Sequence, residues 1–319
     1  LNIMKNDIML ISSGFDQQIR FWSDFNNNKC KSTIEFRESA INALELLPSK
    51  EELAFATNNS IKFLDLVSMN NFPVYSVDSH TAVISCLLFD KAYEQDQVFF
   101  SAGEDSTVKM NDKRILKAVK EFDHSYYVNS IHLGNNNKEL IAADEAGVIK
   151  VWDINKGTCR TEYKAPNTDF NAFRSITVCD QSEYIIAGQS NGNLNLIDYS
   201  KNKDLKLLNS FNAHNSYITK CVLNSDKNIL ATCSADSEIK VWEKNGNKSF
   251  KYKNKLVGHK KWIWDCCFSI DSAYLVSCST DKTIRLWSLS EFRQVSNLTC
   301  PKGVTKIVIC DEESDGGDF

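Results

Sequence analysis

Two segments of the sequence carry the residue types of a catalytic triad. In each, a histidine is followed after 18 residues by a hydroxyl and after 22 residues by an aspartate. A histidine that takes the proton of a hydroxyl, and is itself oriented by a carboxylate, could support nucleophilic catalysis. A catalytic set occurs once, whereas this set recurs, so we interpret both copies as buried hydrogen-bond networks. Their members are His214, Thr232 (or Ser234), Asp236 and Trp242, and His259, Ser277 (or Ser279), Asp281 and Trp287.

Other signatures of catalysis are missing from the sequence. Four of the five histidines occupy a repeated position described below, which leaves only His132, in the apolar run 128–133. One titratable residue without a partner does no acid–base work, so we interpret His132 as a core or strand-surface residue. The strings GxxxxGK[ST], GxGxxG and GxSxG do not occur, and the 11 cysteines show no paired metal spacing. We therefore expect no enzyme activity and no catalytic, metal-binding or cofactor-binding residue.

The elements that must position these sets repeat along the whole chain. The repeated pattern is an acidic or Asn residue, two spacers, an Ile, Val or Leu anchor, a basic residue, an apolar residue and Trp, with degenerate copies. The anchors recur every 41 to 47 residues, and four histidines precede their anchors by 25 to 28 residues. A unit of about 45 residues with four short strands is one blade of a propeller. The anchors are Ile19, Ile61, Val108, Ile149, Leu194, Ile239 and Ile284, and the histidines are His80, His124, His214 and His259.

This signature resembles the WD-repeat family, whose Gly-His and Trp-Asp landmarks recur at the same spacing. Seven copies over 319 residues predict an all-β, seven-bladed propeller. The first copy lacks an inner strand, and residues 303–310 match one, so we predict that the C-terminal strand pairs with the N-terminal blade and closes the ring. The predicted units are blade 1, 8–36 plus 303–310; blade 2, 39–68; blade 3, 80–113; blade 4, 124–156; blade 5, 169–201; blade 6, 214–250; and blade 7, 259–290, followed by an acidic, disordered tail at 311–319.

Several blades depart from the full pattern. The second has no landmark histidine and carries Leu64 in place of Trp, and Cys300 takes the histidine position that serves the first blade. In the third and fifth blades, Asn111 and Ile197 stand where Trp is expected. We expect these blades to depend more on packing than on the polar network.

Composition limits the partners. The net charge is −4 and no apolar run approaches the roughly 18 residues of a membrane span, so we expect neither nucleic-acid binding nor membrane insertion. The lysine-rich stretch 244–255, with Phe250 and Tyr252 interleaved, could grip a nucleic acid, but a solvated edge strand explains it better. The many cysteines in apolar runs indicate a reducing compartment. We expect a cytoplasmic protein, associated with endomembranes only peripherally and through its complex.

Aromatic residues gather at the positions that follow three of the landmark histidines, His124, His214 and His259, and at Phe15 before the turn residue Asp16. Tyr and Trp are the usual anchors of protein interfaces, so a cluster across neighbouring blades predicts a binding face. Phe170 and Phe173 lie near the equivalent place in the fifth blade. The predicted partner-binding face consists of Trp262, Trp264, Tyr217, Tyr126, Tyr127, Phe15 and Lys261.

Stretches in several blades, including 9–22, 213–223 and 258–269, look like the small WD-repeat subunits of the target-of-rapamycin kinase complexes. Residues 72–74, 231–236 and 271–276 extend the resemblance. It implies a non-catalytic subunit that docks one propeller face, including Trp262 and Trp264, on the catalytic domain of the kinase and stabilises it in growth and nutrient signalling. The complexes' other subunits are then further partners. The alternative is a general WD-repeat adaptor, either a ubiquitin-ligase substrate receptor or a ribosome-associated scaffold.

Overall fold

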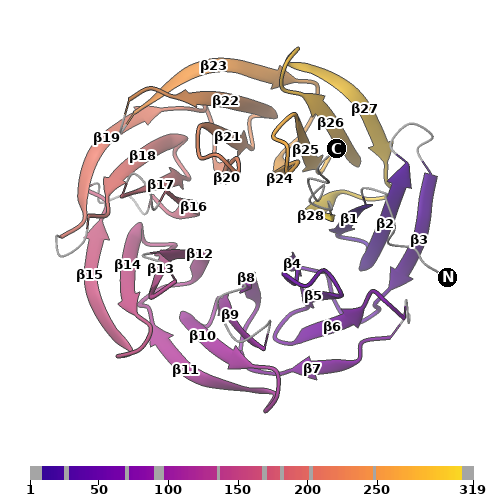
Figure 1. Ribbon diagram of the computed structural model, residues 1–319, viewed down its shortest axis with the longest axis horizontal. Helices are drawn as coiled ribbons and strands as arrows, with labels where there is room; N and C mark the ends of the chain where they lie inside the picture. The colour runs from indigo at the N-terminus through magenta and orange to yellow at the C-terminus, as the bar shows by residue number, and fades with distance from the viewer. Residues whose placement is uncertain are drawn as a thin grey trace, which may run out of the picture.

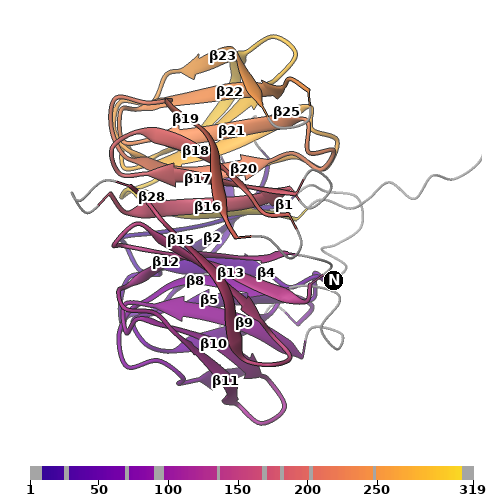
Figure 2. The same ribbon diagram turned by 90° about the vertical axis from the view of Figure 1, so that its left-hand side faces the viewer.

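The described part of the chain forms strands arranged as a closed ring. The structure is a computed structural model that describes residues 9–24, 29–68, 72–89, 97–134, 137–166, 171–179, 183–200, 204–246 and 249–310. These residues form 28 strands in seven four-stranded sheets, and no helix. Figure 1 looks down the ring, with one sheet per blade around a central channel, and Figure 2 shows the ring from its side. The predicted seven-bladed propeller is confirmed.

Each blade is one antiparallel sheet whose strands run from the channel outward in chain order, except in the first blade. The first four blades are β28 (Val304–Cys310), β1 (Met9–Gly14), β2 (Gln18–Asp24) and β3 (Lys29–Glu35); β4 (Ala43–Leu46), β5 (Glu52–Ala56), β6 (Ile61–Asp65) and β7 (Tyr75–Val77); β8 (Ile84–Phe89), β9 (Val98–Gly103), β10 (Thr107–Asp112) and β11 (Lys117–Asp123); and β12 (Val128–Gly134), β13 (Glu139–Asp144), β14 (Val148–Asp153) and β15 (Thr158–Lys164). The other three are β16 (Phe173–Cys179), β17 (Tyr184–Gln189), β18 (Asn193–Asp198) and β19 (Lys206–Asn212); β20 (Ile218–Leu223), β21 (Ile229–Ser234), β22 (Glu238–Lys244) and β23 (Phe250–Val257); and β24 (Ile263–Phe268), β25 (Tyr274–Ser279), β26 (Thr283–Ser288) and β27 (Arg293–Thr299).

The two ends of the ring are joined by strand pairing. β28 pairs antiparallel with β1, from Met9 opposite Cys310 to Gly14 opposite Val304. Blade 1 therefore takes its inner strand from one end of the sequence and its other three strands from the other end. This arrangement removes the exposed strand edge that an open ring would carry. The predicted closure by the C-terminal strand is confirmed.

The sequence-derived blade ranges stop short of the outer strands. In blades 2 to 5 and in blade 7 the predicted range ends before the fourth strand begins, and in blade 6 it ends at the first residue of β23. The reason is the burial of these strands: β11, for example, buries only Phe122 among its seven residues. A strand that is exposed on almost every residue shows no alternation of apolar and polar residues, so the repeat pattern fades at the third strand.

The hydrophobic core is divided among the interfaces between blades. Seven buried clusters each combine residues of two neighbouring blades, including one shared by blades 7 and 1. Hydrogen bonds along the inner strands add to these contacts. Thr219 Oγ1 of blade 6 donates to the carbonyl of Ile263 in blade 7 at 2.5 Å, and the amide of Cys221 donates to Ser175 Oγ of blade 5 at 3.0 Å. Each blade is therefore stabilised mainly by its two neighbours.

The turn between the second and third strand repeats one backbone conformation. In blade 6 the carboxylate of Asp236 accepts the amide of Glu238 at 3.0 Å, and the residue between them, Ser237, is left-handed with φ of 70°. Lys282 of blade 7 has the equivalent φ of 69°, and Gly192 of blade 5 has 85°. An aspartate two residues before an amide forms such a turn with its own side chain. We call the side of the ring that carries these turns the turn face.

Candidate partner-binding face

The two triad-like sets each come together at the turn face. His259 Nδ1 lies 2.9 Å from Asp281 Oδ2, and His259 Nε2 lies 2.8 Å from Ser277 Oγ. Trp287 Nε1 donates to the same Ser277 oxygen at 2.8 Å. In blade 6 the corresponding distances are 2.9 Å for His214 to Asp236, 2.8 Å for His214 to Thr232, and 3.0 Å for Trp242 to Thr232.

The bonds within each set run in the same direction as in a hydrolase triad, but the burial of the hydroxyl separates these sets from a working one. The indole N–H donates to the hydroxyl oxygen, the hydroxyl donates to His Nε2, and His Nδ1–H donates to the aspartate. Ser277 and Thr232 are both fully buried, so neither oxygen can reach a substrate. Burial lowers the pKa of His259, which keeps the ring neutral. Burial alone would raise the pKa of Asp236, but the hydrogen bond and charge of His214 and the hydrogen bonds from the Glu238 and Asn215 amides together outweigh it, and the pKa falls to about 2.

Blade 3 completes the same network with a different side chain. His80 contacts Asp105 Oδ2 at 2.8 Å and Ser101 Oγ at 2.7 Å. Asn111 Nδ2 donates to Ser101 Oγ at 2.8 Å, in the position that the indole N–H occupies elsewhere. The expectation that this blade depends more on packing is therefore wrong, because an amide donor replaces the indole donor without loss of the bond.

Blade 4 has lost the hydroxyl and part of the network. Ala142 stands opposite Lys150, where Ser277 stands opposite Arg285 in blade 7. Trp152 Nε1 donates directly to His124 Nε2 at 3.4 Å, so the hydrogen of the neutral ring belongs on Nδ1. That Nδ1 is buried with no hydrogen bond, and lies 3.6 Å from Asp144 Oδ2. Blade 4 therefore carries a weaker version of the network.

Two further blades with degenerate patterns are stabilised in other ways. In blade 1 Trp22 Nε1 donates to Ser12 Oγ at 2.8 Å, and Cys300 is buried in the position of the histidine. In blade 2 Leu64 packs into the core that blades 1 and 2 share. For blade 2 the predicted dependence on packing agrees with this burial.

An exposed chain of aromatic rings crosses the turn face from blade 6 to blade 1. Tyr217 packs edge-on against Trp262 with ring centroids 5.8 Å apart, and Trp262 lies 5.7 Å from Trp264. Trp264 then packs edge-on against Phe15 at 6.2 Å. Tyr217, Trp262 and Phe15 are 44%, 43% and 47% exposed. We call these four residues the aromatic ridge.

The ridge is held on rigid elements. Trp262 precedes β24, and its carbonyl accepts the amide of Thr280 at 3.0 Å. The half-buried Trp264 donates its indole N–H to Thr280 Oγ1 at 2.7 Å. Lys260 and Lys261 are exposed directly before Trp262, and the carbonyl of Lys261 accepts the hydroxyl of Ser279 at 3.2 Å. The surface is therefore apolar along its length with two cations at its border.

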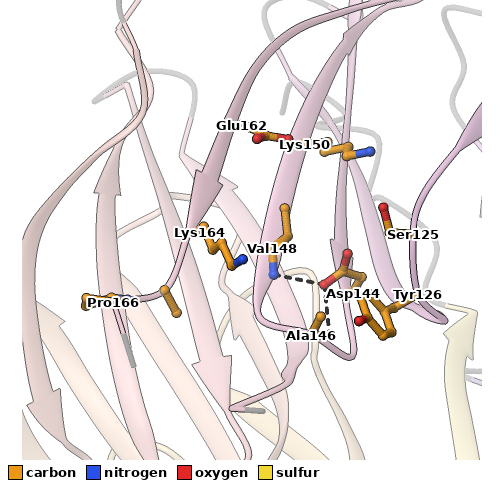
Figure 3. A pocket seen from close by; sticks show the side chains of 10 residues that line it. Ser125, Tyr126, Asp144, Ala146, Val148, Lys150, Glu162, Lys164 and Pro166 are labelled. Atoms are coloured by element: carbon orange, nitrogen blue, oxygen red, sulfur yellow. Dashed lines mark hydrogen bonds between the residues drawn. The ribbon is translucent and has the colours of Figure 1, made fainter. Parts of the chain in front are cut away.

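The other predicted face residues lie apart from the ridge. Tyr126 and Tyr127 of blade 4 are 46% and 53% exposed. Tyr126 lines a cleft of about 670 Å³ beside the turn of Asp144, and Figure 3 shows it across the cleft from Lys164. Phe173, also expected near this surface, is fully buried between blades 4 and 5, and Phe170 lies outside the described residues. The aromatic face is thus continuous in blades 6, 7 and 1 and separate in blade 4.

Residues 250–255 of the lysine-rich stretch lie on β23, the outer strand of blade 6, as predicted for an edge strand, and Lys248 lies outside the described residues. Lys253 Nζ lies 2.9 Å from Glu243, and Lys255 Nζ lies 2.7 Å from Glu238, both within the sheet of blade 6. His132 bonds to the carbonyl of Leu133 at 2.6 Å on the inner strand β12. In the ranges given above, no cluster of His, Cys, Asp and Glu has the arrangement of a metal site, and no helix could cross a membrane.

Comparison with known proteins agrees with the geometry. Residues 116–153, 205–243 and 250–288 match the family "WD domain, G-beta repeat". Each match begins with or just before the outer strand of one blade and ends with the third strand of the next, which again shows that the sequence repeat is offset from the blade. The fold and the matched repeats define a WD-repeat propeller, and its exposed aromatic ridge is the kind of surface that marks protein interaction sites.

Curated relatives narrow the family. Target of rapamycin complex subunit wat1 of Schizosaccharomyces pombe is 33% identical over 75% of this chain and 75% of its own length. LST8 of Saccharomyces cerevisiae, with the same description, is 34% identical over 74% of this chain and 77% of its own length. LST8 of Mus musculus is 30% identical over 74% of this chain and 72% of its own length. The chain belongs to this LST8 and wat1 family of WD-repeat target of rapamycin complex subunits.

Proposed function

We propose that this protein is a non-catalytic subunit of a target of rapamycin complex, and that the aromatic ridge binds the catalytic domain of the kinase and stabilises it. The observation that carries the proposal is the continuous exposed ridge of Tyr217, Trp262, Trp264 and Phe15, on a chain whose relatives are named as subunits of these complexes. The same role implies contact with other subunits of the complex and a cytoplasmic location.

The chemistry of the ridge suits a protein partner. Trp and Tyr are enriched among the residues that dominate interface energies, and rigid aromatic rings lose little entropy on binding. Tyr217 and Trp262 directly precede two neighbouring inner strands, β20 and β24, and the His214 and His259 networks hold the adjacent turns. We therefore expect the partner to cover the ridge with apolar side chains and to place acidic groups near Lys260 and Lys261.

The test removes the exposed rings and measures the complex. Trp262→Ala with Tyr217→Ala deletes the two exposed rings that blades 6 and 7 contribute to the aromatic ridge. Each truncation at an interface centre typically costs about 2 kcal/mol or more. Together they should lower the affinity for the kinase roughly 1,000-fold, so that the kinase no longer co-purifies. Tyr252→Ala is the matched control, because Tyr252 is 46% exposed but lies on the outer strand of blade 6.

The outcomes separate binding from folding. Both variants should retain the wild-type thermal unfolding midpoint, and only the ridge variant should lose the kinase. A kinase that co-purifies undiminished with a folded ridge variant would refute the proposal. Loss of the kinase with Tyr252→Ala and not with the ridge variant would place the interface on the outer rim.

A further inference from the structure

The central channel contains two charged side chains that the fold does not use. The strand pairing places one residue of each inner strand at an equivalent level along the channel. At the level nearer the turn face, which we call the upper level, several of these residues bind the next blade. Ser130 Oγ and Ser175 Oγ accept the amides of Ile176 and Cys221 at 3.2 and 3.0 Å. Asp265 Oδ2 accepts the amide of Ile307 at 3.3 Å. These polar groups are therefore explained by hydrogen bonds between neighbouring blades.

The lysines at this level differ in their pairing. Lys220 of β20 lies 3.3 Å from Asp265 Oδ1, so its charge is balanced within the ring. Lys306 of β28 is half-buried, and no described residue gives it a hydrogen bond or an ion pair. Because an ammonium group in a partly desolvated channel lacks the hydration of a surface lysine, it favours a nearby anion.

Glu45 is the second unused group, and it lies at a lower, more apolar level. Glu45 pairs with Ala54 of the neighbouring strand. The equivalent pair in blade 6 is Val222 with Ala231, so Glu45 occupies the position of Val222. Val222, Cys267 and Val308 therefore share its level. Glu45 forms no hydrogen bond or ion pair with the described residues. A carboxyl group thus lies beside an apolar wall, below an unpaired ammonium group.

These side chains border one cavity. It has a volume of about 280 Å³ and is lined by Glu45, Lys220, Lys306, Val222, Val308 and Phe268, among others. The volume holds a small molecule and no folded partner. We propose that this cavity binds a small amphipathic monocarboxylate, with the ligand carboxylate between Lys306 and Glu45 and its apolar chain against Val222, Val308 and Phe268.

Proton uptake by Glu45 makes such binding depend on pH. Burial raises the pKa of Glu45 to about 7, and the charge of Asp265 adds to this effect, whereas Lys220 and Lys306 oppose it. On the remaining neighbouring strand, β8, burial raises the pKa of the Cys86 thiol, which stays neutral. The protonated carboxyl group donates a hydrogen bond to the ligand, and the ionised group repels it. The affinity should therefore rise as pH falls through 7.

Titration calorimetry with sodium hexanoate tests the proposal on the full chain. Hexanoate should bind, and hexanamide and hexylamine, which have the same chain length, should not. Between pH 6 and pH 8 the protonated fraction of a group with pKa about 7 falls about ten-fold, and hexanoate affinity should fall by the same factor. This pH comparison uses the wild-type protein and needs no variant.

Two variants assign the effect to residues. Lys306→Met should weaken hexanoate binding at least ten-fold, whereas Lys117→Met, on the exposed outer strand of blade 3, should not change it. The Glu45→Gln variant should still bind hexanoate, but its hexanoate affinity should no longer depend on pH. Absence of hexanoate binding, binding unaffected by Lys306→Met, or preferential binding of hexylamine would each overturn the proposal, the last by showing a cation site.

Discussion

Removal of a single buried hydroxyl tests whether the triad-like network stabilises the fold. Ser277 Oγ accepts the indole N–H of Trp287 at 2.8 Å and contacts His259 Nε2 at 2.8 Å. Ser277→Ala would leave two buried polar groups without partners, and each such group costs about 1–3 kcal/mol. Blade 4 shows how much can be recovered, because there Trp152 reaches His124 directly at 3.4 Å.

The ring geometry allows the same recovery in blade 7. The His259 and Trp287 ring centroids are 6.0 Å apart, against 6.1 Å for His124 and Trp152. One long hydrogen bond would therefore replace two good ones, and we expect Ser277→Ala to lower the free energy of unfolding by about 2 kcal/mol. The reverse change, Ala142→Ser, would insert the missing hydroxyl in blade 4 and should raise it by about 1 kcal/mol.

Urea unfolding followed by intrinsic fluorescence and by circular dichroism measures both changes. The exposed Ser125 provides a control, because Ser125→Ala should change the free energy of unfolding by less than about 0.5 kcal/mol. The reasoning is refuted if Ser277→Ala falls within this control range, since the network would then contribute nothing beyond packing. A changed slope of the transition would instead indicate that the blades no longer unfold together.

Two further predictions concern pH and closure. Burial lowers the pKa of three landmark histidines, His80, His124 and His259, below 6.5. The unfolded chain therefore binds more protons than the folded chain, and the free energy of unfolding should fall from pH 8 to pH 5.5. The urea midpoint should be measured in the Glu45→Gln variant, because the raised pKa of Glu45 would stabilise the folded protein as pH falls. A midpoint at pH 5.5 equal to or higher than that at pH 8 would contradict the expectation. Deletion of 303–319 removes β28 and should abolish cooperative unfolding, whereas deletion of 311–319 alone should leave the melting curve unchanged. Two curves that coincide with that of the full chain would show that closure is dispensable.

The sequence predicts the parts of this fold that repeat with buried residues. The anchors and landmark histidines sit at fixed register in every full blade, so the networks of His214 and His259 could be located from spacing alone. The outer strands could not be located from the sequence, because strands such as β19 are exposed along nearly their whole length and carry no periodic signal.

Substitutions that conserve a function but change the residue type also escape sequence analysis. Asn111 differs from Trp in size and polarity, yet it supplies the same hydrogen-bond donor to Ser101. Glu45 lies at an apolar level of the channel, because its pairing with Ala54 places it level with Val222 of blade 6, and only the strand register shows this. Phe173 is adjacent in sequence to the expected surface but points inward, since the first residue of each inner strand is buried.

The pairing of β1 with β28 delays closure of the ring until the end of synthesis. Ser13 and Thr305, which contact each other across this pair, are separated by 292 residues. At roughly 5–20 residues per second, the ribosome needs about 15–60 seconds to make the intervening chain. Throughout that interval the first strands present an unpaired edge and half of an apolar interface. A nascent chain of this protein therefore remains open to mispairing until its last strand emerges, and cells must shield it for longer than a domain of local contacts would require.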